Sequence, residues 1–175
     1  MRHKLRGPAV LPYPGYACTP ALAERPPHLH HQLLRAGLPA AFRHCTFETL
    51  APHHSPTAYQ ICRAYARTGQ HQGKPGLLLI GPPGTGKTSL AAAILHQVVE
   101  RSGGAAGVRF WHVPGGLAAL GTPPTGPRRR VLDLLDYPLV VLDEVGQQPR
   151  TGWETVQFYT LINELWNKDR QLILT

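Results

Sequence analysis

The sequence predicts an α/β fold in which a parallel sheet is flanked by helices. Three observations point to it. A glycine-rich turn joins an apolar run at 77–80 to a helical pattern at 89–100, a second apolar run at 139–142 ends in two carboxylates, and further strand-like runs alternate with helical patterns. Strands that alternate with helices form parallel sheets, which bind ligands beyond the carboxyl ends of their strands. We therefore expect a ligand site at that end of the sheet.

The first residues are expected to form a flexible, Pro/His-rich arm over 1–36, ahead of one domain over 37–175. The arm contains six prolines and little periodicity, and a short helix is expected at 30–36. Residues 1–75 hold nine Lys and Arg against two Asp and Glu. Such a basic front either contacts nucleic acid or an acidic protein, or is a solvated leader, and the sequence favours neither alternative.

Two elements are expected between the arm and the glycine-rich turn. Residues 37–52 are expected to be irregular, with Phe42 and Phe47 packing onto the domain. A helix is predicted from Ser55, because Pro56 suits a first helical turn, where a missing N–H costs no hydrogen bond.

Residues 81–88 match the pattern G-x-x-x-x-G-K-T of a phosphate-binding loop, with a predicted strand before it and a predicted helix after it. The backbone amides of such a loop converge on phosphate oxygens, and the helix start adds its positive dipole end. We expect a nucleotide to be bound by Gly81, Pro82, Pro83, Gly84, Thr85, Gly86, Lys87, Thr88 and Ser89.

Four side chains have chemical roles in this prediction. Lys87 is expected to reach the β- and γ-phosphates as a catalytic residue, and the Thr88 hydroxyl is expected to ligate Mg²⁺. The strand at 139–142 delivers Asp143, which holds Mg²⁺ through water, and Glu144 is expected to be the catalytic base that polarises the attacking water. An acid directly after the aspartate favours ATP hydrolysis over phosphate transfer to a small molecule. The alternatives are a plain glycine turn and an ordinary acidic turn.

Three further elements are predicted between these segments. Residues 108–113 predict a strand, a short helical turn is expected at 117–120, and Pro127 is expected to open a helix. The arginines at 128–130 stand at the start of that helix, which is an unfavourable end for positive charge. They either contact phosphate or form a solvent-facing cluster, and the sequence favours the second.

The last residues predict a long helix and a fourth strand. Thr151 and Glu154 have the spacing of a capping box, and an apolar stripe over 153–168 predicts the helix, with Trp166 packed against the domain. The fourth strand is expected at 171–175.

Composition argues against several classes of protein. Three isolated cysteines without a C-x-x-C pair argue against a disulfide scaffold and give no spacing for a zinc site. Cys18 could pair with the histidines at 28, 30 and 31 to bind a metal ion, but a polar loop is expected there instead. No apolar stretch approaches the ~20 residues that cross a membrane. Prolines interrupt the apolar region that would follow the basic start at 1–6 in a signal peptide, so we expect a cytoplasmic protein.

Several segments together resemble one family. They are Gly37-Leu38-Pro39 with Phe42, Thr46-Phe47-Glu48, the run 76–88, and the run 139–146. From about residue 37 to the end, the chain resembles the DnaC/IstB-like AAA+ ATPases, a group of P-loop NTPases. These include bacterial and phage helicase loaders and the ATP-dependent helpers of insertion-sequence transposases. The resemblance implies ATP and Mg²⁺ as cofactors, with Lys87, Thr88, Asp143 and Glu144 in the roles already given.

The resemblance also implies partners, namely single-stranded DNA, a replicative helicase or a transposase, and further copies of the chain in a homo-oligomer. The leading function is ATP-dependent helicase loading in DNA replication. A transposition helper that acts on duplex DNA shares the whole ATP site and is the alternative. A non-hydrolysing ATP-binding adaptor is also open, whereas a small-molecule kinase is disfavoured by Glu144.

The chain departs from the family near its end. In that family the sheet has five strands in the order 5-1-4-3-2, and a polar residue at the end of the fourth strand senses the γ-phosphate. We expect this chain to be truncated within the fourth strand, with Thr175 as a poor substitute for that residue. The strand at 77–80 would then lie at a sheet edge. The truncation would also remove the arginine finger that members of the family offer to a neighbouring subunit. Hydrolysis would then be very slow, because an arginine finger contributes ~10³–10⁵ in rate where it is used.

Overall fold

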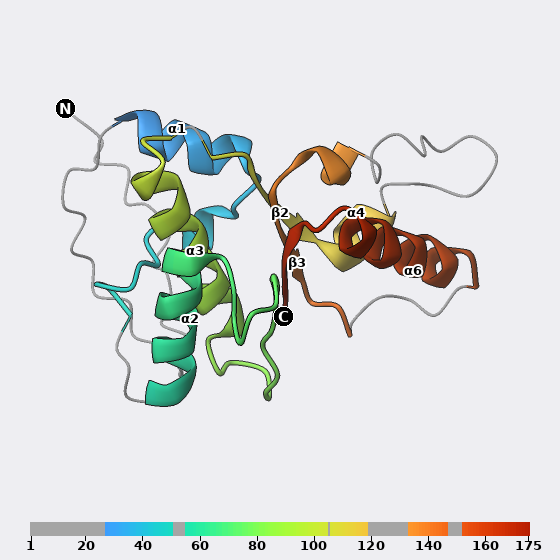
Figure 1. The fold of residues 1–175 in the computed structure, drawn as a ribbon, viewed down its shortest axis with the longest axis horizontal. Coiled ribbons are helices and arrows are strands. Elements are labelled where there is room, and N and C mark those ends of the chain that lie inside the picture. Colours follow the sequence, from blue (N-terminus) through green and yellow to red (C-terminus); the bar gives the residue numbers. More distant parts are fainter. Residues whose placement is uncertain (1–26, 51–54, 105, 119–132, 147–151) are drawn as a thin grey trace, which may run out of the picture.

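The computed structural model describes residues 27–50, 55–104, 106–118, 133–146 and 152–175. Within them, a four-stranded parallel sheet lies between two layers of helices (Figure 1). Its strands are β1 (Gly76–Leu78), β2 (Val108–His112), β3 (Leu139–Asp143) and β4 (Gln171–Leu174). The predicted α/β fold with a parallel sheet is confirmed.

The strands lie in the order β1-β4-β3-β2, as the resemblance implied. β3 lies inside the sheet between β2 and β4, and all five of its residues are buried. A strand that is covered on both faces has no solvent-facing position for a polar side chain. This explains why its sequence is apolar without interruption until Asp143, where the strand ends.

β1 lies at an edge of the sheet, also as expected, and pairs in parallel with β4. Leu77 is buried under the helices of one layer. Its neighbour Leu78 points to the opposite face and is 58% exposed, and Ile80, two residues on, is 85% exposed. In the part of the chain that the structure describes, this side of β1 is therefore uncovered.

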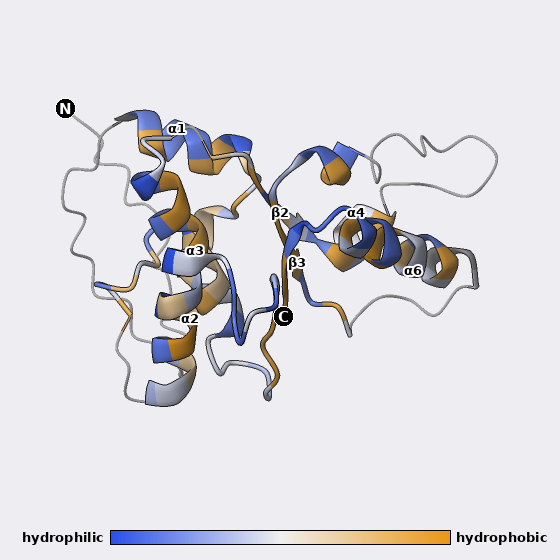
Figure 2. Cartoon of the chain, in the orientation of Figure 1, coloured by the Kyte–Doolittle hydropathy of each residue, from blue (hydrophilic) through white to orange (hydrophobic). Residues whose placement is uncertain are grey.

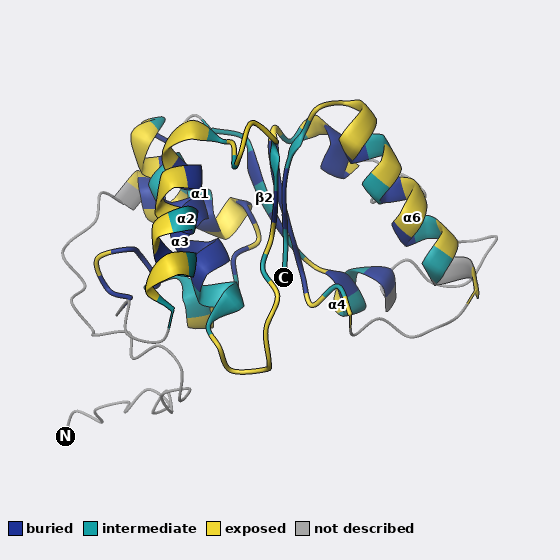
Figure 3. Cartoon of the chain, turned by 60° about the horizontal axis from the view of Figure 1, so that its bottom comes forward, coloured by how far each residue is buried: buried dark blue, intermediate teal, exposed yellow. Residues whose placement is uncertain are grey.

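One face of the sheet is covered by α1 (Pro27–Arg35), α2 (Pro56–Thr68) and α3 (Lys87–Arg101), which lie together in Figures 1 and 3. α3 is the central helix, because seven consecutive residues, Leu90 to His96, are all buried. Its three alanines at 91–93 are small, which allows close packing. Hydrophobic and hydrophilic residues both occur along α1 and α2 (Figure 2), as expected of helices that have one solvent face.

The other face is covered by α4 (Val113–Ala118), the 3₁₀ helix η3 (Asp133–Asp136) and α6 (Gly152–Asn167), of which α4 and α6 are labelled in Figure 3. Their buried core residues are Val113, Leu117, Leu134, Leu135, Phe158, Leu161 and Leu165. The predicted stripe of the long helix is thus confirmed. Trp166, however, is 60% exposed, so the prediction that it packs against the domain is wrong. The next residue on a helix is turned by about 100°, and this turn carries Trp166 away from the core that holds Leu165.

α1 differs from the expectation for the arm. The helix begins at Pro27, not at residue 30, and Leu29, Leu33 and Ala36 are buried in the same core as α3. The Ala36 carbonyl accepts a hydrogen bond of 2.7 Å from the Phe110 amide, so the end of α1 covers the outer edge of β2. Residues 27–36 therefore belong to the packed structure. Residues 1–26 lie outside the described residues.

The segment after α1 packs as predicted, around the 3₁₀ helix η1 (Ala40–Phe42). Phe47 is buried and its ring meets the Tyr59 ring edge-on, while Phe42 is partly buried against the same core. α2 begins directly after Ser55 with Pro56 in its first turn, which confirms the predicted start of the helix.

Two of the shorter predicted elements differ from the structure. The helical turn expected at 117–120 is α4, which begins at 113, directly after β2. The helix expected from Pro127 is described only at 133–136, where it is a 3₁₀ helix. The arginines at 128–130 and Thr151 of the expected capping box lie outside the described residues.

Cys45 and Cys62 are buried, and burial raises the pKa of Cys62 to about 12. Cys18 lies outside the described residues. Among the residues that the structure describes, no group of three or more His, Cys, Asp and Glu is placed to hold a metal ion. None of the described helices is both long enough and apolar enough to span a membrane.

Leu165→Ala is expected to lower the free energy of unfolding by about 2–4 kcal/mol, because the side chain is fully buried between α6 and the sheet and its truncation leaves a cavity. Val156→Ala on the same helix is the matched control. Val156 is 58% exposed, and its truncation should change the free energy by less than about 0.5 kcal/mol. Urea unfolding followed by circular dichroism measures both, and equal effects would contradict the packing of α6.

Candidate functional site

The glycine-rich loop joins β1 to α3 at the carboxyl end of the sheet. Gly84 and Gly86 have φ angles of 79° and 82°, a left-handed conformation that glycine adopts without steric cost. A Cβ atom at Gly84 would meet nothing within 4 Å. The backbone conformation, and not a lack of space, therefore requires glycine at this position.

α3 begins inside the loop motif, at Lys87, two residues before the predicted start. Its N-cap is Gly86, which has no side chain to accept a hydrogen bond from the first amides of the helix. Unpaired amides at the start of a 15-residue helix favour an anion, because they add to the positive end of the helix dipole. The nine residues predicted to bind the nucleotide thus form one segment, which combines a glycine turn with a helix start.

The Lys87 ammonium lies over the loop. Its Nζ atom donates hydrogen bonds of 2.9 Å to the carbonyls of Gly81 and Pro82. The Thr85 hydroxyl donates to the same Pro82 carbonyl over 2.8 Å. The positive charge of Lys87 is therefore concentrated beside the amides of the loop, where phosphate oxygens would meet both.

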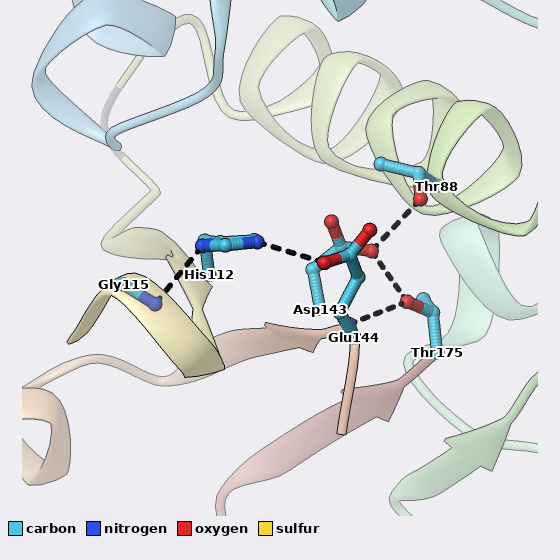
Figure 4. A network of polar contacts seen from close by, with 6 residues as sticks. All are labelled: Thr88, His112, Gly115, Asp143, Glu144 and Thr175. Carbon is cyan, nitrogen blue, oxygen red and sulfur yellow. Dashed lines mark hydrogen bonds and ion pairs between the residues drawn. The ribbon is translucent and has the colours of Figure 1, made fainter. Parts of the chain in front are cut away.

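Thr88 and Asp143 are in direct contact, although 55 positions separate them in the sequence. The Thr88 hydroxyl donates a hydrogen bond of 2.8 Å to Oδ1 of Asp143, which is buried at the end of β3 (Figure 4). The structure thus brings together the two residues that were predicted to hold Mg²⁺, one on the first turn of α3 and one at the end of a central strand.

Thr175, directly after β4, completes the surroundings of Asp143. Its hydroxyl donates to the same Oδ1 atom and accepts a hydrogen bond of 3.3 Å from the Glu144 amide (Figure 4). The sequence predicted only that Thr175 would poorly replace a polar sensor residue. The structure gives it a contact with both acids of the predicted pair.

Glu144 leaves β3 in a left-handed conformation, with a φ of 60°. Its carboxylate does not follow that of Asp143 towards Thr88. Instead, its Oε2 atom lies 2.9 Å from Nε2 of His112, the last residue of β2 (Figure 4). Both side chains are about half exposed, at 46% for His112 and 53% for Glu144.

His112 is a site residue that sequence reasoning missed. Its position carried a usable signal, because His112 ends the strand next to β3 and pairs in register with Asp143. Ligand sites of parallel sheets lie beyond such strand ends, so polar residues there are candidates from the outset. The order of the strands had to be known before His112 could be placed next to Glu144.

A cavity of about 630 Å³ lies beside the loop. It is bounded by β1, by the loop itself and by the first turns of α2, and its apolar lining includes Ala58, Ile61 and Leu79. Ser55 and His71 add polar groups. This volume is in the range of pockets for small molecules and cofactors, and one end of the cavity is the phosphate-binding segment.

A family model described as "IstB-like ATP binding protein" matches residues 44–175. The chain belongs to this family. The match includes the loop, Asp143, Glu144, His112 and Thr175, so the whole candidate site lies within the matched residues. The resemblance to the DnaC/IstB-like AAA+ ATPases is confirmed, and ATP is the ligand that the family's description names.

Two solved structures share the fold of this IstB-family chain. The crystal structure of the DnaC helicase loader aligns with a TM-score of 0.64 and 24% identity, over 78% of this chain and 78% of that one. AMPPCP-bound DnaA from Aquifex aeolicus aligns with a TM-score of 0.61 and 20% identity, over 78% of this chain and 42% of that one. At such identities the likeness shows the fold alone. No curated protein matches the chain.

The oxygen atoms of this IstB-family site fit Mg²⁺. A hydroxyl and a carboxylate are hard oxygen donors, which Mg²⁺ prefers. The two oxygens of Thr88 and Asp143 lie 2.8 Å apart, so the hydroxyl and the carboxylate face the same point beside the loop. Thr88 would therefore hold the ion directly and Asp143 would hold it through water, as the sequence predicted.

Thr88→Val is expected to abolish the stimulation of ATP binding by Mg²⁺, because it removes the hydroxyl that contacts Asp143 and would bind the ion. ATP binding without Mg²⁺ should change less than threefold. Titration of a fluorescent ATP analogue at several Mg²⁺ concentrations measures the effect. Thr160→Val is the control, since Thr160 is exposed on α6 and its hydroxyl bonds to the Val156 carbonyl of its own helix. Undiminished stimulation in the Thr88 variant would exclude Thr88 as a ligand.

Proposed function

We propose that this IstB-family protein binds ATP with Mg²⁺, hydrolyses it, and acts as a helicase loader in DNA replication. The observation that carries the ATP site is the hydrogen bond between Thr88 and Asp143. It places the start of α3, the glycine-rich loop and the end of β3 around one point, where a triphosphate and its metal ion require them.

The proposed binding mode assigns a part of the ligand to each part of the site. The amides of residues 81–88 and the first turn of α3 bind the phosphates, and the Lys87 ammonium neutralises their negative charge. The cavity between β1 and α2 accommodates the base and ribose, because Ala58, Ile61 and Leu79 offer an apolar surface to a base. Mg²⁺, when bound, supplies positive charge that stabilises the charge developing on the phosphate oxygens.

In the proposed hydrolysis, Glu144 is the general base. It directly follows Asp143 and is half exposed, so its carboxylate can reach a water molecule near the phosphate end of the site. The base accepts a proton from this water as the water attacks the γ-phosphate, the bond from the γ-phosphorus to the β–γ bridging oxygen breaks, and ADP leaves; the ammonium of Lys87 stabilises the phosphoryl oxygens.

Lys87→Ala is expected to weaken ATP binding at least tenfold, because it removes the only charge that the loop itself places beside the phosphate site. Isothermal titration calorimetry with ATP and Mg²⁺ measures the affinity. Lys168→Ala serves as the control, since Lys168 is an exposed lysine that follows α6 and lies outside the proposed site. An unchanged affinity in the Lys87 variant would place the phosphates elsewhere.

Glu144→Gln is expected to retain ATP binding within about twofold and to lose at least 100-fold of whatever hydrolysis the wild-type chain shows. Glutamine has nearly the same shape but cannot accept a proton, and general-base catalysis contributes typically 10²–10⁴-fold. Release of phosphate in the presence of ATP and Mg²⁺ measures turnover. The same rate in wild type and variant would exclude Glu144 as the base.

The role as a helicase loader is supported by the fold that the chain shares with the DnaC helicase loader over 78% of both chains. A second candidate, an IstB-like helper of transposition, is supported by the family description itself. The ATP site is common to both roles. A non-hydrolysing ATP-binding adaptor is the third candidate, and an ATP-binding chain without measurable turnover would favour it.

DNA binding and self-association are parts of the proposal that concern the surface of the protein. Among described residues, the exposed arginines Arg63, Arg67 and Arg101 lie towards the ends of α2 and α3, and Arg101 bonds to the Arg67 carbonyl. Positive side chains of this kind attract the phosphates of single-stranded DNA. We also propose that the protein works as a homo-oligomer in the cytoplasm.

A pull-down with the immobilised protein distinguishes the candidates. It is performed with a hexameric replicative helicase and, separately, with a transposase, each with and without ATP and Mg²⁺. ATP-dependent retention of the helicase supports helicase loading. Retention of the transposase alone contradicts helicase loading and supports the transposition helper.

A further inference from the structure

α6 carries apolar residues on two sides. One side meets the sheet, and its buried residues are Phe158, Leu161 and Leu165. On another side, Val156, Tyr159 and Trp166 are 58%, 63% and 60% exposed. They are three of the six large apolar side chains that are exposed in the described part of the chain, and Figure 3 shows exposed residues along the outer side of this helix. The outer side of a surface helix is normally polar, so this second apolar side needs a reason.

These exposed residues form one row along the helix. Together with the exposed Asn163 they occupy positions 156, 159, 163 and 166, which is the spacing of the a and d positions of a heptad. At about 100° per residue, the four positions lie within an arc of about 80°. We call these four residues the α6 seam, because rows of this kind are the surfaces along which two helices pack.

The aromatic ring of Tyr159 is held in place by the core. Its centroid lies 6.4 Å from that of the Phe158 ring, in an edge-on arrangement with 61° between the two ring planes. A ring that already rests on a buried neighbour has little rotational freedom left to lose when a partner covers it. The α6 seam is therefore a preformed surface.

The α6 seam contains no charged residue. The sequence of α6 has two acidic residues and no basic one, and Glu164, the acid whose side chain the structure describes, is partly buried and about 120° from the middle of the seam. A nucleic acid, or a protein with a charged surface, would lack ion pairs on such a seam. A second copy of the same neutral seam meets it without opposing like charges.

The order of residues in the α6 seam is complementary to itself. Its spacing is the same in both directions, so two antiparallel copies align with Val156 facing Trp166 and Tyr159 facing Asn163 of the other copy. Each layer then combines a large side chain with a smaller one, which keeps the two helices evenly spaced. A parallel pair would instead place Trp166 against Trp166 and Val156 against Val156. The Tyr159 hydroxyl and the Asn163 amide can also bond to each other, since both groups donate and accept hydrogen bonds.

From this arrangement we propose that α6 is the contact surface for a second copy of this chain, in a symmetric dimer whose two α6 helices pack antiparallel. Twofold dimers use the same patch on both copies, as a self-complementary seam requires. Four seam residues per copy make a small interface, so we expect a weak dimer with a Kd on the order of 10–100 µM. This inference rests on the homo-oligomer of the proposed function and names a surface for it that contains none of the candidate site residues.

Sedimentation equilibrium of the full chain without ATP, from about 5 to about 500 µM, measures the dimer. We expect the wild-type chain to pass from monomer to dimer over this range. Tyr159→Lys places a charge in the seam of each copy and should raise the Kd at least about tenfold. Leu34→Lys is the matched control, because Leu34 is 40% exposed on α1 in the other layer of helices, and its Kd should stay within about twofold. A wild-type chain that stays monomeric would overturn the proposal, and so would a Tyr159 variant that dimerises like wild type.

A mixture of two variants tests the antiparallel arrangement. Tyr159→Lys and Asn163→Asp should each weaken self-pairing. In an antiparallel mixed dimer the new lysine faces the new aspartate, and the other layer keeps its original tyrosine and asparagine. We expect the mixture to associate at least about fivefold more tightly than either variant alone, a gain that also shows that both variants are folded. A mixture that associates no better than the separate variants would overturn the antiparallel pairing.

These outcomes are distinct from those that test ATP binding. The dimer is measured without ATP, and Lys87 lies outside α6. A chain that binds no ATP but dimerises through the α6 seam contradicts the proposed ATP site and retains this inference. A chain whose oligomers are unchanged by Tyr159→Lys retains the proposed homo-oligomer and refutes the α6 seam as its surface.

Discussion

The rest of this structure depends on how α3 is held against the sheet. The helix is buried almost all the way around, between the sheet below it and α1 and α2 beside it, so its position is fixed along its length. Its first turn carries Lys87 and Thr88, and the glycine-rich loop must end where that turn begins. Because the helix cannot shift, the Thr88 hydroxyl meets Asp143 at the end of β3. A buried carboxylate needs hydrogen-bond donors, and two threonine hydroxyls supply them.

The two adjacent acids use different partners, although they follow one another in the chain. Asp143 is buried and accepts hydrogen bonds from α3 and from the residue after β4. Glu144 is exposed and is held by the end of β2. Adjacent residues of a strand already point to opposite faces, and the left-handed backbone at Glu144, with a φ of 60°, turns its side chain further out of the strand geometry. One acid is thus suited to hold a metal ion, and the other to meet water.

The two edges of the sheet have different surroundings. The end of α1 packs along the outer edge of β2. There the Phe110 amide donates to the Ala36 carbonyl, and the Arg109 guanidinium donates to the Arg35 carbonyl over 2.9 Å. Gly37 permits this approach, since a Cβ atom there would lie 2.9 Å from the Phe110 carbonyl oxygen. At β1, the described chain leaves Leu78 and Ile80 largely exposed. Sheet edges with exposed apolar residues associate readily, and among the described residues β1 presents such an edge.

The sequence by itself determined the α/β class, the loop at 81–88 and the acids at 143–144, because strand and helix periodicities and the spacing of glycines are local properties of the chain. The same local rules failed for α1 and for Trp166. Prolines and histidines obscured the spacing of Leu29, Leu33 and Ala36, and the orientation of Trp166 depends on which helix face meets the sheet. Only the tertiary structure placed His112 beside Glu144 and Thr175 beside Asp143. These contacts join the ends of strands that are neighbours in the sheet but not in the chain, and strand order is set by the packing of the whole domain.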